Sequence, residues 1–470
     1  MAALLVELLV ECERRAQDGM GPCAVRRCER EAMDSFFKIS ERGSSVSAEV
    51  VGGITTFLAM AYVVAVNSNM MAAAGIPFSA ALTSTCLGAA VATVAMGLIA
   101  NRPIALASGM GLNAVVAFSI CQGAGVDWRV AMAVVFVEGV AILLLVLCGL
   151  RTAIMDAIPA DLRRAIAIGI GLFISFIGLS GSGLVVADPS TLIALGDLAS
   201  PSCIVAVVSV LCAVVFHAAS VKGGLILSIV AATAVGVPLG VTPLPESWEF
   251  GLDLAAFAAP FQVDPATGTL AIVQVFAQPL LLLFVFSLLM SDFFDTMGTV
   301  IAVGERGGFV DAQGRVEDAK AILAVDSAAA AAGGFLGASS ITSYAESATG
   351  IVAGARTGFS NLVVGALFAA CAFLSPIFGM VTSAATCGVL LLVGYLMLTD
   401  VGRVNWQDME SAFPAFITIV AIPMTYSISN GIGLGFISYC AIMVARGRAR
   451  EVKPLMWIAA AAFLVAFVLA

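Results

Sequence analysis

The stretch VAMAVVFVEGVAILLLVLCGL, from Val130 to Leu150, contains a single charged residue, Glu138. An α-helix rises about 1.5 Å per residue, so roughly 20 apolar residues in a row cross the hydrocarbon core of a bilayer. Similar runs recur from residue 49 to the end of the chain, which is 61% hydrophobic and only 11% charged. The sequence therefore predicts an all-α integral membrane protein embedded in a lipid bilayer.

Apolar length and turn residues predict fourteen spans in two groups of seven. The first group lies near residues 49–72, 77–99, 104–124, 130–150, 165–184, 202–219 and 222–242, and the second near 272–303, 318–338, 342–358, 359–380, 383–400, 412–427 and 430–446. Because each group holds an odd number of spans, two similar halves would be inverted relative to each other in the membrane.

The chain divides into five predicted segments. They are an N-terminal extension at 1–35 that is disordered or precedes the true start at Met33, a first repeat at 36–242, an extracytoplasmic loop at 243–271, a second repeat at 272–446, and a basic linker with a terminal apolar segment at 447–470. Residues 455–470 form either a fifteenth span or a helix on the membrane surface.

The distribution of Lys and Arg predicts the orientation. Alternate loops carry nearly all of these residues, and the opposite loops hold a single base, Arg129. Cytoplasmic loops retain basic residues, so the N-terminus is expected in the cytoplasm of a protein of the cell membrane.

The chain shows no sign of enzyme chemistry. Its single histidine and eleven cysteines form no CxxC pair or Cys/His cluster, and no Ser/His pair or phosphate-binding glycine loop is present. We therefore expect no metal, no cofactor and no catalytic residue. The net charge of −9 gives no reason to expect a nucleic acid partner, and the sequence leaves the choice between a monomer and a homodimer open.

Acidic residues inside the spans are the candidate functional groups, because a charge at lipid depth usually faces a cavity. Asp292 and Asp295 share one helix face in Met290-Ser-Asp-Phe-Phe-Asp-Thr-Met-Gly-Thr299, and Glu346 lies in Ser343-Tyr-Ala-Glu-Ser-Ala-Thr-Gly-Ile351. For Glu138 and Asp326 we favour a structural role.

Two spans are too polar and too rich in glycine for continuous helices, and we expect each to contain a short extended segment. The tenth carries Glu346 and is interrupted at Gly350 and Gly354, and the third contains Ser108-Gly-Met-Gly-Leu-Asn113 with a single amide side chain. Irregular backbone at membrane depth usually lines a cavity, so the two broken spans predict a site at the midplane. Carboxylates there suit a flat heterocycle with N–H donors, such as a purine, and an acid in an apolar site can take up a proton.

These motifs resemble the AzgA-like adenine/guanine/hypoxanthine permeases of the nucleobase-cation symporter group, within the xanthine/uracil permease superfamily. The resemblance extends from about Phe36 to Gly447 and rests on a series of ordered motifs. They are Ile39-Ser-Glu-Arg-Gly-Ser44, Thr55-Thr-Phe-Leu-Ala-Met-Ala-Tyr62, Gly109-Met-Gly-Leu-Asn113, Ala165 to Gly178, Phe294-Asp-Thr-Met-Gly298 and Glu346-Ser-Ala-Thr-Gly-Ile351.

The resemblance implies two inverted seven-span repeats divided into a core domain and a gate domain, with the substrate between the third, eighth and tenth spans. It assigns substrate binding and proton coupling to Asp292 and Glu346, with Asp295 and Asn113 in support and the backbone of Ala345 against the base. Ala114 to Ala117 stand where relatives often have aromatic residues, which leaves the preferred purine open.

The function that we expect is import of purine nucleobases by proton symport through alternating access. One alternative is a uracil, xanthine or ascorbate carrier of the same superfamily, and Na⁺ in place of H⁺ stays open. Another is an anion transporter or channel of the same architecture, which would favour a buried base over two acids.

Overall fold

The computed structural model describes residues 31–149, 158–221, 223–245, 250–310 and 316–469. Most of the predicted extension at 1–35 lies outside these residues. The described chain begins in a helix at Glu31, and Phe36, Phe37 and Ile39 pack against Leu98 and Phe359. The segment that follows residue 30 is therefore attached to the transmembrane helices.

The helices follow the order of the predicted spans, and the prediction of an all-α membrane fold is confirmed. In the first half they are α3 (Val46–Met60), α4 (Tyr62–Ala73), α5 (Phe78–Ile99), β1 (Leu106–Ser108), α6 (Met110–Ala114), the π-helix η1 (Val115–Gly123), α7 (Trp128–Leu147), α9 (Ala160–Gly181), β2 (Val185–Asp188), β3 (Leu192–Leu195), α10 (Pro201–Ala218) and α11 (Gly224–Gly236).

The second half repeats this pattern. Its elements are η2 (Ala259–Phe261), α12 (Ala271–Ala277), α13 (Pro279–Gly307), α14 (Ala319–Leu336), β4 (Ile341–Ser343), α15 (Ser347–Val352), α16 (Phe359–Cys371), α17 (Ser375–Phe378), α18 (Ser383–Leu398), η3 (Thr399–Arg403), α19 (Met409–Met424), α20 (Ile428–Ala445), η4 (Ala449–Glu451) and α21 (Pro454–Leu469). Within the described part of the chain, nine helical stretches are long and apolar enough to cross a membrane.

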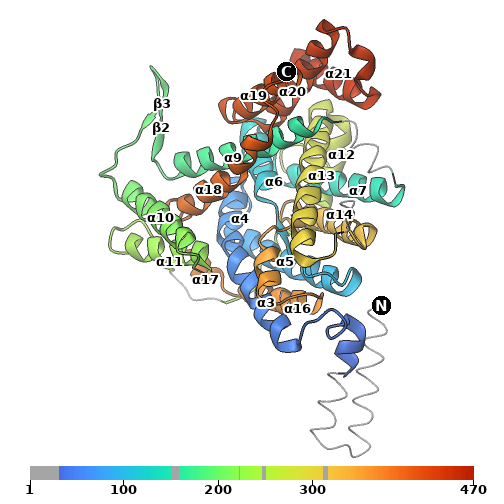
Figure 1. Ribbon diagram of the computed structural model, residues 1–470. Helices are drawn as coiled ribbons and strands as arrows, with labels where there is room; N and C mark the ends of the chain where they lie inside the picture. The colour runs from blue at the N-terminus through green and yellow to red at the C-terminus, as the bar shows by residue number, and fades with distance from the viewer. Residues whose placement is uncertain (1–30, 150–157, 222, 246–249, 311–315, 470) are drawn as a thin grey trace, which may run out of the picture.

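The helices pack as two groups, which correspond to the core and gate domains. The core group contains α3 to α7 and α13 to α16, and the gate group contains α9 to α11 and α18 to α20. In Figure 1, α10 and α11 lie on the side of the molecule opposite α7 and α14. The interface between the two groups is where an alternating-access transporter would change shape.

Glycines let the core helices cross at very short range. A Cβ at Gly139 of α7 would lie 2.2 Å from the backbone nitrogen of Ala331 on α14, and one at Gly334 would lie 2.5 Å from that of Phe136. Small residues at such crossings allow helix backbones to approach closely in a membrane. A polar side chain near this crossing is therefore enclosed between α7 and α14.

The span predicted at 272–303 differs from the structure, which divides it into α12 and α13 at Gln278. Gln278 has φ −117° and ψ 114°, and Pro279 occupies the first turn of α13. A residue before proline is pushed out of the α region, and proline is well suited to the first helical turn. The longer helix α13 then continues to Gly307.

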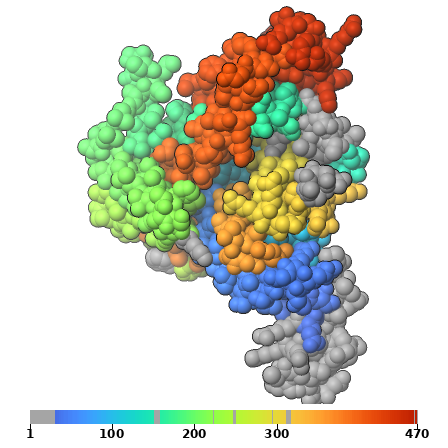
Figure 2. Space-filling model, in the orientation of Figure 1, coloured from blue at the N-terminus to red at the C-terminus, as the bar shows by residue number. Residues whose placement is uncertain are grey.

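A short β-hairpin, β2 paired with β3, lies between two of the predicted spans. It connects α9 to α10 and projects from the rest of the molecule in both the ribbon and the space-filling views (Figures 1 and 2). The sequence places it in a loop between two spans.

The terminal helix α21 runs antiparallel to α20. Phe467 lies against Gly433, Phe463 against Phe436 with ring centroids 6.0 Å apart, and Met456 near Cys440. Residue numbers rise along one helix as they fall along the other. The sequence left the segment 455–470 as a span or a surface helix. Its described residues pack along the length of the last predicted span, 430–446.

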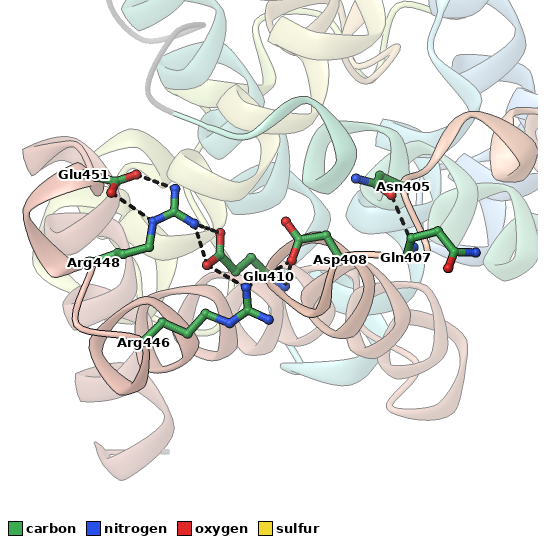
Figure 3. Close-up of polar contacts among 7 residues, drawn as sticks. All are labelled: Asn405, Gln407, Asp408, Glu410, Arg446, Arg448 and Glu451. Carbon is green, nitrogen blue, oxygen red and sulfur yellow. Dashed lines mark hydrogen bonds and ion pairs between the residues drawn. The ribbon is translucent and has the colours of Figure 1, made fainter.

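Ion pairs join the ends of α19, α20 and η4. Arg446 and Arg448 donate hydrogen bonds to Glu410 at 3.0 and 2.7 Å, and Arg448 also donates to Glu451 (Figure 3). Hydrogen bonding to the Arg448 guanidinium lowers the pKa of the Glu451 carboxyl. The basic linker predicted at 447–470 is thus tied to the end of the gate group.

Candidate functional site

The two broken spans meet in a short antiparallel β-pair. β1 of the third span pairs with β4 of the tenth, with Leu106 opposite Ser343, Ala107 opposite Thr342 and Ser108 opposite Ile341. All six residues are buried. Pairing satisfies backbone groups that would otherwise be unbonded at membrane depth, so the predicted extended segments are confirmed as elements that support each other.

Glu346 lies at the start of α15, directly after β4, and its side chain is half-buried. The hydroxyl of Tyr62, at the start of α4, donates a hydrogen bond to Glu346 Oε1 at 2.8 Å. The ring of Tyr62 is 2% exposed, so the phenol has little freedom to move. Tyr62 therefore fixes the orientation of the Glu346 carboxylate.

Asp295 and Ala345 are not covered by other parts of the protein, although α13 packs against β4 and α15, the elements on either side of Ala345. Asp295 is close enough to Glu346 and Asp326 to be affected by their charges. A Cβ at Gly298, one turn further along α13, would meet no heavy atom within 4 Å. Asp295, Ala345 and Glu346 are thus the uncovered or half-buried residues where α13 packs against α15, and the space beside them is called the accessible space below.

Asp292 lies behind this space, because only 1% of it is exposed. Thr296 donates a hydrogen bond to Asp326 Oδ2 at 2.7 Å and lies 3.4 Å from Asp292 Oδ1. Asp326 also accepts from the backbone nitrogen and the hydroxyl of Ser343 on β4, at 2.8 and 2.7 Å. A polar network therefore joins Asp292 to the strand that precedes Glu346.

Asn113 on α6 is fully buried, and neither its Nδ2 nor its Oδ1 has a hydrogen-bond partner among the described residues. A buried amide without partners costs about 1–3 kcal/mol for each unsatisfied group. Because α6 packs against α13 and α9, Asn113 stands between the core and gate groups. Such a side chain is free to donate one hydrogen bond and accept another from a ligand.

The predicted site residues thus divide into two sets. Asp295, Ala345 and Glu346 come together at the accessible space, whereas Asp292 and Asn113 are enclosed by protein. Sequence reasoning assigned no role to Tyr62, Thr296 or Thr342. A phenol inside the first span needs a polar partner at that depth, so the sequence could have indicated that the Tyr62 hydroxyl bonds to another polar group.

The arrangement is suited to a small planar ligand that has both hydrogen-bond donors and acceptors. Glu346 and Asp295 can accept N–H groups, and Asn113 can accept one hydrogen bond and donate another. Among the residues that the structure describes, no group of three His, Cys, Asp or Glu side chains is arranged to hold a metal ion.

Comparison with known proteins gives close relatives over nearly the full chain. It is 39% identical to the adenine permease AdeP of Escherichia coli K12, over 93% of this chain and 96% of that protein. It is 38% identical to the guanine/hypoxanthine permease PbuG of Bacillus subtilis 168, over 93% of this chain and 99% of that protein.

Solved structures match at the level of the fold. The transmembrane domain of the cyanobacterial bicarbonate transporter BicA has a TM-score of 0.62 at 15% identity, covering 82% of this chain and 97% of that domain. The murine anion transporter Slc26a9 in its inward-facing state has a TM-score of 0.61 at 12% identity, covering 85% of this chain and 69% of that protein.

The model of the permease family Xan_ur_permease matches residues 47–434, which include both broken spans and every residue of the accessible space. With this match and the identities above, the chain belongs to that permease family and is a transporter rather than an enzyme.

Proposed function

We propose that the protein imports purine nucleobases, adenine, guanine and hypoxanthine among them, across the cell membrane by proton symport. The sequence relatives named for adenine and for guanine/hypoxanthine transport support the substrate class. The chemistry of the site supports it independently, since its charged groups are carboxylates and its neutral polar group is an amide.

The observation that carries the proposal is the Glu346 carboxylate, oriented by Tyr62 beside the accessible Asp295. A carboxylate held in one orientation can accept two N–H groups in the plane of a purine ring. Asn113, which is enclosed in this state, would bind another edge of the same ring when movement of the core and gate groups exposes it. Glu346 and Asp295 would bind the base. Asp292, which is buried behind them, would take part in coupling purine transport to proton movement.

The cycle that we propose is alternating access between the core and gate groups. On one side, Phe118 of η1 packs against Tyr426 of the gate group with ring centroids 6.0 Å apart. Tyr426 also packs against Phe173 and Phe176 of α9 at 5.1 and 5.9 Å. This aromatic cluster lies toward the side predicted to be extracellular and closes it.

On the other side, α13 presents an accessible stripe that runs from Asp295 through Gly298 and Ala302 to Glu305. Two carboxylates on this stripe indicate contact with water rather than lipid. The stripe leads to the end of α13 that is predicted to be cytoplasmic. We therefore infer an inward-facing state, in which outward opening would require Phe118 and Tyr426 to separate.

A uracil or xanthine carrier of the same family is the second candidate for the substrate. An anion carrier is less compatible with the site, because the charged residues around the accessible space, Asp295 and Glu346, are both acidic. An anion site would need helix termini or basic groups directed at the ligand. The likeness to bicarbonate and anion transporters concerns the fold alone.

Uptake measurements test the proposal directly. Cells that lack purine transport would express the chain and be given labelled adenine, guanine, hypoxanthine, xanthine and uracil, with and without a protonophore. We expect uptake of purines that the protonophore abolishes. Uptake of uracil alone, or purine uptake that is unaffected by the protonophore, would contradict the substrate or the coupling respectively.

A further inference from the structure

Glu138, near the middle of α7, is a fully buried carboxyl. The residue is 0% exposed, and the polar groups within its reach are the carboxyl of Asp292 and the hydroxyl of Ser340. The close crossing of α7 and α14 at Gly139 and Gly334 leaves little space beside it. A carboxylate in such a place would lose its hydration without compensation, which strongly disfavours the charged form.

The groups that act most strongly on Glu138 are acidic as well. They are Asp292 on α13 and Asp326 on α14, with the hydroxyl of Ser340 as the main neutral neighbour. Of the other elements packed against α7, α12, η1 and η2 contain no carboxyl and no basic residue. Glu138 therefore faces two acids across helix interfaces without a basic residue to neutralise them.

Ser340 provides a second, independent indication of a ligand. Its residue is 0% exposed, and its hydroxyl lies within hydrogen-bonding reach of Glu138. The carboxyls of Glu138 and Asp292 are also within hydrogen-bonding reach of each other, and two carboxyl groups can share a hydrogen bond only when one of them carries a proton. Two carboxyls within reach of each other, with no basic residue between them, suit a proton as the occupant.

We propose that Glu138 is the binding site of the transported proton, distinct from the purine site and connected to it through Asp292. The inference rests on the proton symport proposed above. With the proton bound, the neutral Glu138 carboxyl can donate its O–H to Asp292, and without it two adjacent carboxylates repel each other. The event is a single proton moving on and off a carboxylate oxygen, and no other bond changes.

The polar network behind the purine site connects Asp292 to the strand that precedes Glu346. Thr296 connects Asp292 to Asp326, and its hydroxyl lies 2.8 Å from that of Thr342 on β4. Asp326 holds the backbone nitrogen of Ser343, three residues before Glu346. A change of charge at Glu138 and Asp292 would therefore act on the strand that positions Glu346.

The exit of the proton follows the same helix. Asp292 and Asp295 lie one turn apart on α13, the first enclosed and the second accessible. In the inward-facing state the proton can pass from Glu138 to Asp292 and then to water at Asp295. Release of the proton would thus occur beside the released purine.

Glu138→Gln in reconstituted vesicles tests the inference, because the amide imitates the protonated acid but cannot give up a proton. We expect exchange of labelled for unlabelled adenine within about twofold of the unmodified protein. Accumulation of adenine driven by a pH gradient should fall to the equilibrium level, and adenine-dependent proton flux should disappear.

Glu49→Gln is the matched control. Glu49 is also 0% exposed, but its Oε1 accepts hydrogen bonds from the backbone nitrogens of Arg356 and Thr357 at 2.8 and 3.1 Å. We expect this variant to keep adenine accumulation driven by the pH gradient, because Glu49 lies in the first turn of α3 and no other acid is among the groups that act on it. Loss of coupling in Glu49→Gln as well would overturn the assignment to Glu138.

Two results with Glu138→Gln would contradict the proposal, namely full accumulation driven by the pH gradient, or loss of adenine exchange in a folded protein. If the unmodified protein itself shows no accumulation driven by the gradient, the proton symport of the proposed function is wrong. Should Glu138→Gln fail to fold, Glu138→Asp decides. We expect this variant to stay coupled with a shifted pH profile, and an unchanged profile would overturn the inference.

Discussion

The two broken spans share a backbone plan but differ in chemistry. Each has a three-residue strand followed by a short helix, and the two strands pair with each other. The first presents Asn113, a neutral amide that is fully buried and without a partner among the described residues. The second presents Glu346, a half-buried carboxylate held by Tyr62.

This difference separates two tasks that a single symmetric site could not perform. An acid can bind N–H groups and exchange a proton, whereas an amide can read both a donor and an acceptor of the ligand without changing its charge. The inverted repeat thus provides the same scaffold twice, with a charged group on one half-span and a neutral group on the other. The energetic contributions of the two half-spans should differ accordingly.

The largest effect is expected at the charged half-span. Glu346→Gln should lower purine uptake, as kcat/KM, by about 100-fold, because hydrogen bonds to a charged group contribute about 1.5–3 kcal/mol and the amide places a donor where the base also donates. Initial rates of labelled adenine uptake, normalised to the amount of protein in the membrane, measure this.

Glu305→Gln is the control for Glu346→Gln, because Glu305 lies on the same accessible stripe but at the end of α13. It should retain uptake within about twofold, since exposed charges are screened by water and salt. Equal losses in the two variants would show that the stripe, and not the half-span, carries the function.

A smaller effect is expected from Tyr62→Phe, which leaves Glu346 in place but removes the hydrogen bond that orients it. We expect KM for adenine to rise about tenfold with little change in kcat, since about 1.4 kcal/mol corresponds to a factor of ten. In a background of Glu346→Gln the same change should add little, because the two residues act as one unit. A full additional tenfold loss in the double variant would show that Tyr62 acts separately from Glu346.

The sequence alone predicted the positions of both broken spans and both of their polar residues. Long apolar runs and interrupting glycines are local signals, so the helices and the breaks could be located without a structure. The partners of Glu346 and Asp326 could not, because Tyr62 and Thr296 are distant in the chain and their contacts depend on how helices cross. The same limit applies to Glu138, for which the sequence favours a structural role, because its contact with Asp292 depends on how α7 packs against α13.

The smallest effect on transport is expected at the neutral half-span. Asn113→Ala should raise KM for purines about fivefold, because a hydrogen bond between neutral groups contributes about 0.5–1.5 kcal/mol. The same change should raise the Tm of the purified protein without purine, because it removes a buried amide that has no partner among the described residues. The ratio of the losses at Glu346 and Asn113 then measures how unequal the two half-spans are.

Asn67→Ala sharpens this last test, because Asn67 is equally buried but its Nδ2 donates to Thr85 Oγ1 and to the carbonyl of Ala338, at 2.8 and 3.1 Å. Loss of these bonds should lower Tm, in the direction opposite to Asn113→Ala. Thermal unfolding of both variants, with and without adenine, separates an amide that maintains the fold from one reserved for the ligand. If Asn113→Ala also lowers Tm and leaves KM unchanged, then Asn113 supports the fold, and only the half-span of Glu346 contacts the purine.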